Sequence, residues 1–234
     1  SFIESSKILF MICFVVLPVE KCKLDDSACM KNAFQTALSV FVEGIPELDV
    51  EVLDPMDIDD VAFNLSGLQF TLTDGKMKGL KGAVIDNVKW DPSKQRINID
   101  YHLNGFVKGH YTAAGRLLIL PISGDGQMKL RLKHLAVSMY IDYKIKKGAD
   151  DKDYVVPTKY GFDFEIKENA HFNLSNLFNG NKELSGPMHA FLNENWQQVS
   201  VEFGRPLMEA AANKLFKNVQ RFFAKQPIGD IAEL

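Results

Sequence analysis

The feature that most constrains the fold of this 234-residue chain is a long region of alternating hydrophobicity. Between about Val50 and Phe172, apolar residues recur at every second position, most plainly in segments 68–72, 97–103 and 160–166. This period of two is typical of β-strands with one buried face. Turn signals such as Thr73-Asp74-Gly75 separate the segments, and no helical pattern intervenes. We therefore predict an antiparallel meander.

The alternation changes phase once. Apolar residues in segment 128–132 occupy even-numbered positions, whereas those in segment 135–145 occupy odd-numbered positions. One extra residue near Lys133-His134 would restore a single apolar face, which is the definition of a β-bulge. Because bulges bend long strands, we expect a strongly curved sheet.

Two regions follow the helical spacing of three and four residues. The first runs from Cys29 to Glu43, before Gly44, and predicts a short N-terminal amphipathic helix. The second runs from Lys182 to about Lys225 and predicts one long C-terminal helix with an apolar face.

Gly204-Arg205-Pro206 interrupts the long helical pattern. Proline lacks the N–H needed by the helical hydrogen-bond ladder, so the helix axis should change direction between Phe203 and Met208. The predicted fold class is α+β, with a long kinked C-terminal helix wrapped by the curved antiparallel sheet. Such an arrangement leaves an elongated interior that apolar side chains either fill or line as a hydrophobic tunnel.

The composition narrows the functional classes. Hydrophobic residues make up 46% of the chain and charged residues 24%, which is typical of a globular protein. The formal net charge is −3, whereas a nucleic-acid-binding protein needs clustered Lys and Arg against phosphates. We expect no nucleic-acid partner.

The N-terminal segment has the pattern of a secretory signal. Lys7 precedes an apolar run from Ile8 to Leu17 that is too short to span a bilayer as a helix, and charged residues resume at Glu20. We predict a signal peptide at residues 1–17 and a single domain at residues 18–234. The alternative is a buried N-terminal strand or helix.

Secretion would decide how the cysteines behave. Cys13 would leave with the signal peptide, so Cys22 and Cys29 would be the only thiols of a protein in an oxidising compartment. We expect them to form a disulfide. Two Asn-X-Ser sequons, at Asn64 and Asn173, are compatible with an extracellular location.

Signatures of catalysis are missing from the sequence. It contains no Gly-X-Ser-X-Gly, His-Glu-X-X-His, Gly-X-X-X-X-Gly-Lys-Ser/Thr or Cys-X-X-Cys motif. His102 and His110 would meet as metal ligands only if the intervening chain folded back, and we favour separate surface histidines. We expect no enzyme activity, no catalytic residue, no metal and no cofactor.

Two charged groups have alternative interpretations. An acidic cluster invites a calcium-binding hypothesis, but it lacks the glycine and terminal glutamate of an EF-hand loop, so a solvated connection is favoured. A set of lysines could contact anionic membranes, although lysines alternating along a strand are more often its solvent face. The acidic cluster is Asp54, Asp57, Asp59 and Asp60; the lysines are Lys76, Lys78, Lys81, Lys89, Lys144, Lys146 and Lys147.

Several short motifs occur in an order that resembles the insect takeout and juvenile hormone-binding protein family, one of the tubular lipid-binding proteins. The takeout branch fits best because one cysteine pair remains, where the hormone-binding branch usually has two. The matching stretches are Leu17-Pro18-Val19-Glu20-Lys21-Cys22, the Cys22 and Cys29 pair, Gly79-Leu80-Lys81-Gly82, Gly109-His110-Tyr111, Gly115-Arg116, Gly124-Asp125-Gly126, Asn176-Leu177-Phe178-Asn179-Gly180 and Phe191-Leu192-Asn193-Glu194-Asn195-Trp196.

This resemblance implies a secreted, extracellular carrier. Its ligand would be a small hydrophobic molecule, such as a fatty acid, terpenoid, quinone-like or hormone-like compound, held in an internal tunnel by a monomer. Strand alternation and helical spacing select seven candidate ligand-binding residues. They are Phe70, Tyr101, Phe162 and Phe164 from the sheet and Trp196, Met208 and Phe216 from the helix.

Two other functions remain open from the sequence. The protein could be a lipid-transfer or membrane-associating protein that exchanges apolar cargo at bilayers, for which the exposed lysines would matter. It could also be a protein–protein signalling module whose apolar stripe is ordinary core.

Overall fold

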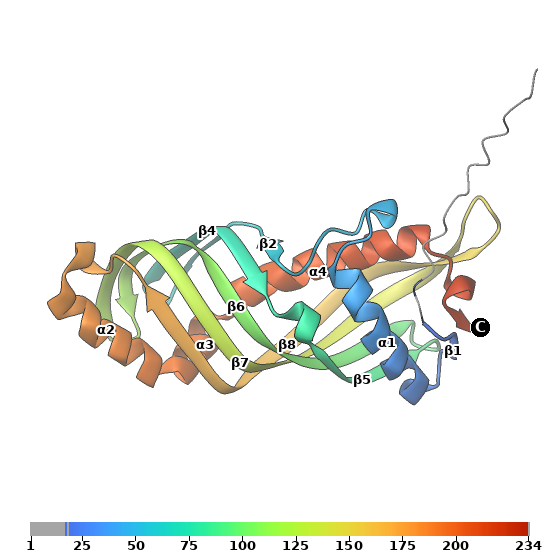
Figure 1. Cartoon of the computed structure of the whole chain (residues 1–234), viewed down its shortest axis with the longest axis horizontal. Helices are drawn as coiled ribbons and strands as arrows, with labels where there is room; N and C mark the ends of the chain where they lie inside the picture. The colour runs from blue at the N-terminus through green and yellow to red at the C-terminus, as the bar shows by residue number, and fades with distance from the viewer. Residues whose placement is uncertain (1–16, 18, 234) are drawn as a thin grey trace, which may run out of the picture.

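The structure is a computed structural model that describes Leu17 and residues 19–233. The predicted signal peptide lies outside the described residues except for Leu17, so it stays a prediction. In the elongated molecule of Figure 1, long strands cross obliquely from one end to the other, and the C-terminal helices run along them.

One antiparallel sheet of seven strands makes up most of the fold. Its order is β2-β4-β6-β7-β8, with β3 paired to β4 and β5 paired to β6. The three long strands β6, β7 and β8 form the predicted meander. The strands are β2 (Met56–Ile58), β3 (Val61–Leu65), β4 (Leu68–Lys78), β5 (Val84–Asp91), β6 (Arg96–Leu117), β7 (Leu120–Lys147) and β8 (Asp153–Leu174).

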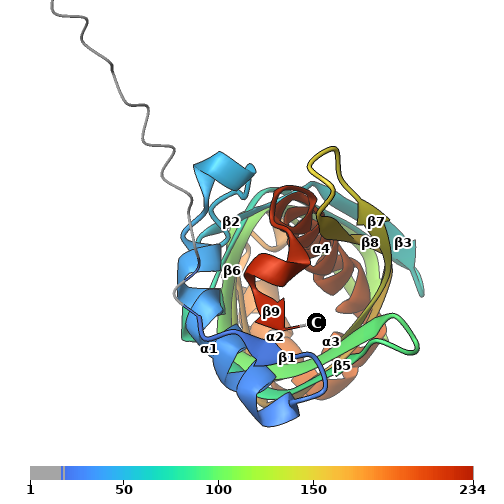
Figure 2. The same ribbon diagram turned by 90° about the vertical axis from the view of Figure 1, so that its right-hand side faces the viewer.

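The sheet is curled, and two of its irregularities occur at the same level, in the neighbouring strands β6 and β7. In β7, the register against β8 shifts between Lys133 and Leu135. His134 has a positive φ of 55° there, and its backbone N–H donates to Asn104 Oδ1 at 2.9 Å. The register of β6 against β7 shifts at the same level, between Leu103 and Gly105. The bulge predicted near Lys133-His134 is confirmed, and Figure 2 shows the sheet curving around α4.

The C-terminal helical region is three helices rather than one. They are α2 (Lys182–Glu194), α3 (Trp196–Phe203) and α4 (Arg205–Lys225). The predicted change of direction between Phe203 and Met208 is confirmed, because the helix breaks at Gly204 and Pro206 lies at the start of α4 (Figure 1). The expectation of an otherwise continuous helix is wrong. Asn195 has a non-helical φ of −106° and ψ of 26°, and its side chain donates to the Phe191 carbonyl.

The two chain ends meet at one end of the molecule. The short strands β1 (Cys22–Lys23) and β9 (Ala232–Glu233) pair in parallel. The disulfide between Cys22 and Cys29 is confirmed, with the two Cα atoms 5.7 Å apart. Cys29 lies in the predicted N-terminal helix, α1 (Ser27–Val42), whose first turn is capped by the Asp26 carboxylate accepting from the Cys29 N–H. Short 3₁₀ turns connect the other elements at Pro46–Leu48, Leu80–Gly82, Phe178–Gly180 and Ile228–Asp230.

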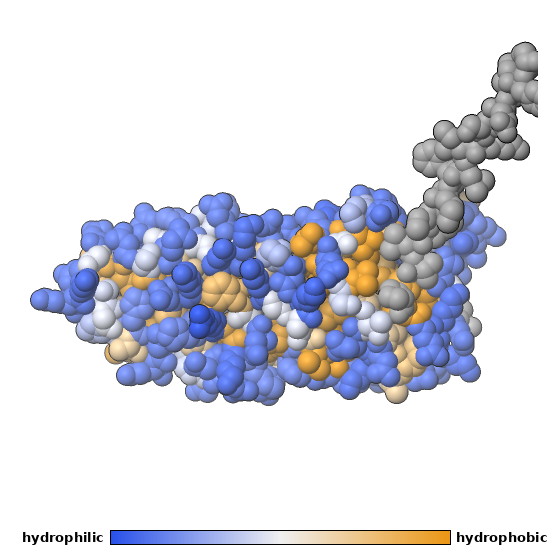
Figure 3. All heavy atoms as spheres, viewed as in Figure 1, coloured by the Kyte–Doolittle hydropathy of each residue, from blue (hydrophilic) through white to orange (hydrophobic). Residues whose placement is uncertain are grey.

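Apolar side chains are turned towards the interior of the curled sheet. The face shown in Figure 3 is mainly hydrophilic, and apolar residues gather on it mostly around α1. Among the described residues, no helix combines the length and the apolar character needed to cross a membrane. The arrangement of sheet and helices confirms the predicted α+β class, with the curved sheet around the kinked C-terminal helices.

Candidate functional site

Three apolar cavities follow one another between the sheet and the C-terminal helices. The largest, of about 190 Å³, lies under α1, between β5, β6 and the C-terminal half of α4. Its aromatic lining comes from elements far apart in the sequence, and the N- and C-terminal segments contribute Leu17, Val19 and Ala232. The aromatic residues are Phe34, Phe41, Trp90, Tyr101, Phe222 and Phe223.

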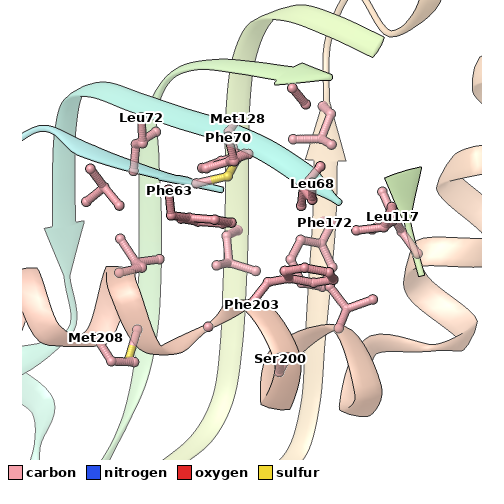
Figure 4. Close-up of a pocket in the computed structure, with 18 of the residues that line it drawn as sticks. Phe63, Leu68, Phe70, Leu72, Leu117, Met128, Phe172, Ser200, Phe203 and Met208 are labelled. Carbon is pink, nitrogen blue, oxygen red and sulfur yellow. The ribbon is translucent and has the colours of Figure 1, made fainter. Parts of the chain in front are cut away.

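The second cavity, of about 100 Å³, lies at the other end of the sheet. Figure 4 shows its side chains converging from the strands and from the helices. Phe63 and Phe70 stack with ring centroids 5.3 Å apart, and Phe63 also stacks on Phe203 of α3 at 6.3 Å. These rings fix the cavity wall through aromatic contacts rather than through polar ones.

A small third cavity, of about 40 Å³, lies between the other two. It shares Leu80, Tyr101 and Leu215 with the largest cavity, and it shares Phe164 and Met208 with the second. The three cavities therefore form one row beside α4, separated by a few side chains.

The lining of this row is almost entirely hydrocarbon. Ser200 and Tyr101 contribute its hydroxyl groups. Burial raises the pKa of Tyr101 to about 12, because a phenolate loses its hydration in an apolar site. At neutral pH the tyrosine is uncharged, and the other lining side chains do not ionise. The row can therefore hold an apolar molecule by burial alone.

Five of the seven candidate residues line these cavities. Phe70 lines the second cavity, Phe162 the middle one, and Tyr101, Phe164 and Met208 each line two. They are brought together because β4, β6, β8 and α4 all present their apolar faces to the same interior.

The other two candidates lie outside the row. Trp196 begins α3 and lines a groove on the outside of the molecule, between α3 and β8. Phe216 is buried, and its ring lies 4.7 Å from that of Tyr160. Leu215, one position earlier, faces the cavities instead. The 100° step of a helix moves Phe216 off the cavity stripe and onto β8.

The sequence argument missed the contribution of α1. The apolar stripe of α1 predicts a helix, but it does not show which part of the fold that stripe packs against. In the structure, Phe34, Leu38 and Phe41 of α1 line the largest cavity. The same cavity takes Trp90 from β5, whose ring meets Phe34 edge-on at 6.5 Å. The only sequence signal was the mixture of large and small residues on that face of α1, including Ala33 and Ala37.

The histidines considered as metal ligands lie apart. His102 and His110 are eight residues apart on the continuous strand β6, about 26 Å at the usual rise of a strand. His102 Nδ1 lies 2.7 Å from Asp86 and its ring stacks on His134, whereas His110 Nε2 lies 2.7 Å from Asp125. Across Leu17 and residues 19–233, no group of three or more His, Cys, Asp or Glu side chains is arranged to hold a metal ion.

The acidic cluster connects parts of the fold. The Asp54 carboxylate accepts backbone N–H groups of Gly79 and Lys81, at 3.2 and 2.8 Å. Asp57 forms an ion pair with Lys76, and Asp59 lies 3.3 Å from Lys214 of α4.

Comparison with known proteins assigns the chain to a family and to a known fold. Residues 8–233 match the family described as haemolymph juvenile hormone binding protein. The crystal structure of Takeout 1 from Epiphyas postvittana superimposes with a TM-score of 0.91 and 61% identity, covering 92% of this chain and all of that one. The circadian clock-controlled protein daywake of Drosophila melanogaster is 31% identical over 231 residues, which are 92% of this chain and 87% of daywake.

A third relative is named for its ligand. The juvenile hormone-binding protein of Manduca sexta is 30% identical over 81 residues, which are 33% of this chain and 35% of that protein. The match over residues 8–233 and the shared fold lead to one conclusion: this chain belongs to the haemolymph juvenile hormone binding protein family, on the side that resembles takeout.

Proposed function

We propose that this protein is a secreted carrier that binds one small, elongated hydrophobic ligand in the row of cavities between its sheet and α4. The observation that carries the proposal is the uninterrupted apolar lining, in which neighbouring cavities share side chains. Removing apolar surface from water stabilises a complex by roughly 25 cal/mol per Å². A ligand that displaced the shared side chains would turn the row into the predicted tunnel.

The absence of charge in the lining suits fatty acids, terpenoids, quinones or hormone-like esters better than polar metabolites. A relative named as a juvenile hormone-binding protein supports this class of ligand. We propose no reaction, because a pocket that only buries its ligand stabilises ground state and transition state alike. Incubation with esters or phosphates should therefore show no turnover, and hydrolysis abolished by one point substitution would contradict this.

Two measurements test the carrier function. Native mass spectrometry of protein purified from its natural secretion should show a retained small apolar molecule. Titration with cis-parinaric acid, a fatty acid with a fluorescent chain, should saturate at one site. Ala37→Phe, which fills part of the largest cavity, should weaken binding about tenfold, or about 1.4 kcal/mol.

The matched control is Thr36→Phe, on the exposed side of α1, which should bind like the parent. Failure of the parent to bind any apolar probe, with no retained molecule, would favour a filled core and a signalling role.

Membrane transfer is the alternative function. Of the lysines that could contact a bilayer, Lys76 pairs with Asp57, Lys81 with Glu43 and Lys147 with Asp153. Such surface pairs are weak and screened by salt. Binding to anionic vesicles at low salt, lost at high salt, would support a transfer protein rather than a free carrier.

A further inference from the structure

Strand β8 is the last strand of the sheet, and its unpaired edge lies against the C-terminal helices. We call this contact the seam. It is held by helix side chains that form hydrogen bonds with the β8 backbone. The Asn193 amide exchanges hydrogen bonds with both backbone groups of Phe172, at 2.8 and 3.1 Å. The Leu174 N–H donates to His189 Nε2 at 3.0 Å. At the far end, Gln220 donates to the Pro157 carbonyl at 3.1 Å. These side chains stand in for the missing next strand of the sheet.

Between these points two residues of α4 reach β8: Glu209 accepts a hydrogen bond from the Tyr160 hydroxyl at 2.9 Å, and Arg205, at the start of α4, is the one that bonds the β8 backbone in the described structure. Its guanidinium donates to the Phe162 carbonyl at 3.2 Å and lies over the Phe162 ring, 4.5 Å from the centroid. From residue 163 to residue 171, the described residues place no helix side chain in a hydrogen bond to the β8 backbone. Alternation along β8 points the N–H and C=O groups of Phe164 and Ile166 at this unbonded part of the seam.

The outer groove that contains Trp196 lies on this part of the seam. Gln197 and Val201 of α3 form one side, and Val201 is 82% exposed. Phe164, Ile166 and Ser200 line both this groove and the second cavity. These three side chains are therefore the wall between solvent and the apolar interior.

The helix is also interrupted at this place. The α3–α4 break at Gly204 faces Phe164, since a Cβ built on Gly204 would lie 3.3 Å from the Phe164 ring. Pro206 has no N–H to donate across the break, although the Gly204 N–H still donates to the Ser200 carbonyl at 2.9 Å and the Met208 N–H to the Gly204 carbonyl at 3.1 Å. Because the hydrogen-bond ladder is thinned here, the short helix α3 can tilt away from β8 at the loss of few helical hydrogen bonds.

We propose that the part of the seam between Arg205 and Asn193 is the portal through which an elongated apolar ligand enters and leaves the cavities. This inference rests on the proposed carrier function. Arg205 holds the portal closed, because among the described residues that line the groove it alone donates a hydrogen bond to the β8 backbone. Opening requires only that α3 move and that Phe164 and Ile166 change rotamer.

The test is the rate of exchange of cis-parinaric acid, measured by stopped-flow fluorescence on the parent and on Arg205→Ala. A substitution that eases opening of the portal should raise the association and the dissociation rate constant by the same factor, because the ligand crosses the same barrier when it enters and when it leaves. Loss of one hydrogen bond and a ring contact should speed both rate constants about three- to tenfold and leave the Kd unchanged. Arg205→Lys keeps the positive charge but lacks the planar guanidinium that both donates to the Phe162 carbonyl and lies over the Phe162 ring. It should therefore also speed both rate constants.

Gln220→Ala is the matched control, because it removes the same kind of clamp from β8 away from the groove. Its exchange rates should equal those of the parent. The portal is refuted if Arg205→Ala and Arg205→Lys exchange ligand at the parental rate, or if Gln220→Ala speeds exchange equally. If the parent binds no probe at all, the carrier function fails instead.

Discussion

Asn218 shows how one buried polar side chain holds the loop before β2 against α4. It is fully buried and accepts the Glu51 N–H at 2.8 Å, while its own amide donates to Glu51 Oε2 at 3.0 Å and to the Lys214 carbonyl at 2.9 Å. The Asn218 hydrogen bond is the main cause that lowers the pKa of the Glu51 carboxyl below its ordinary value of 4.5; Lys214 and Arg221 add to it. The folded structure therefore stabilises the ionised form of the Glu51 carboxyl.

Replacing Asn218 by Leu should lower the free energy of unfolding by about 1 to 3 kcal/mol, because the Glu51 N–H loses its partner. Chemical denaturation checks this, with Asn32→Leu on the exposed face of α1 as the control. Because the folded pKa of Glu51 is lowered, its stabilising effect is present above pH 4.5 and is lost as the pH falls through the folded pKa. The difference between parent and variant should therefore shrink as the pH falls further below 4.5. A pH-independent difference would contradict the role of Glu51.

At the scale of elements, the break between α3 and α4 lets the helices follow the curled sheet. Gly204 keeps helical dihedral angles, with φ of −75° and ψ of −26°, so no left-handed conformation selects glycine there. Glycine is required instead by the lack of room for a side chain. A Cβ at this position would lie 2.4 Å from the Ser200 carbonyl oxygen and 3.3 Å from the Phe164 ring. The close approach of the helix to β8 therefore depends on a missing side chain.

Gly204→Ala should destabilise the protein by about 1 to 3 kcal/mol, because Phe164 or the helix must move. Gly186→Ala is the matched control in α2, since no atom apart from its own neighbours along α2 lies within 4 Å of its added Cβ. That substitution should change the stability little, because the gain from replacing a glycine inside a helix is offset by the contact of the new Cβ with the following Pro187. Thermal unfolding of both variants checks the pair. Equal shifts of the same sign would mean that the tight contact at Gly204 is relaxed without cost.

At the scale of the whole molecule, the question is whether one ligand can occupy the entire row of cavities. The middle cavity is the smallest of the three, and Ala211 of α4 contributes to its wall. A tryptophan side chain at this position would fill the middle cavity and separate the two end cavities.

Ala211→Trp should therefore abolish most of the affinity for a long-chain fatty acid while a short-chain one that fits a single end cavity still binds. The melting temperature should change little, whereas the same change in a close-packed core would cost about 1 to 3 kcal/mol. Calorimetric titrations with the two chain lengths measure the effect, and Lys217→Trp on the exposed side of α4 is the control. Equal losses for both chain lengths would contradict a single continuous site, and a large loss of stability would identify Ala211 as ordinary core.

Periodicity was sufficient to predict the elements and much of their shape. A period of two over more than a hundred residues identified the meander, and a change of parity located the bulge at His134 because the side chains of a strand alternate strictly. Pro206 predicted the break after Phe203 because a missing N–H acts locally. The pairing of Cys22 with Cys29 followed from their being the only thiols left after the predicted cleavage.

Only the tertiary structure decided which apolar faces are filled and which leave space. Periodicity tells which side of an element avoids water, but the volume between two such sides depends on their separation, and on rotations of a few tens of degrees along a helix. The break at Asn195 and the step from Leu215 to Phe216 therefore put Trp196 and Phe216 outside the row of cavities, although both lie on the apolar stripe. The partnership of α1 with β5, and the unclamped stretch of the β8 edge, depend on contacts between distant segments that no local pattern specifies.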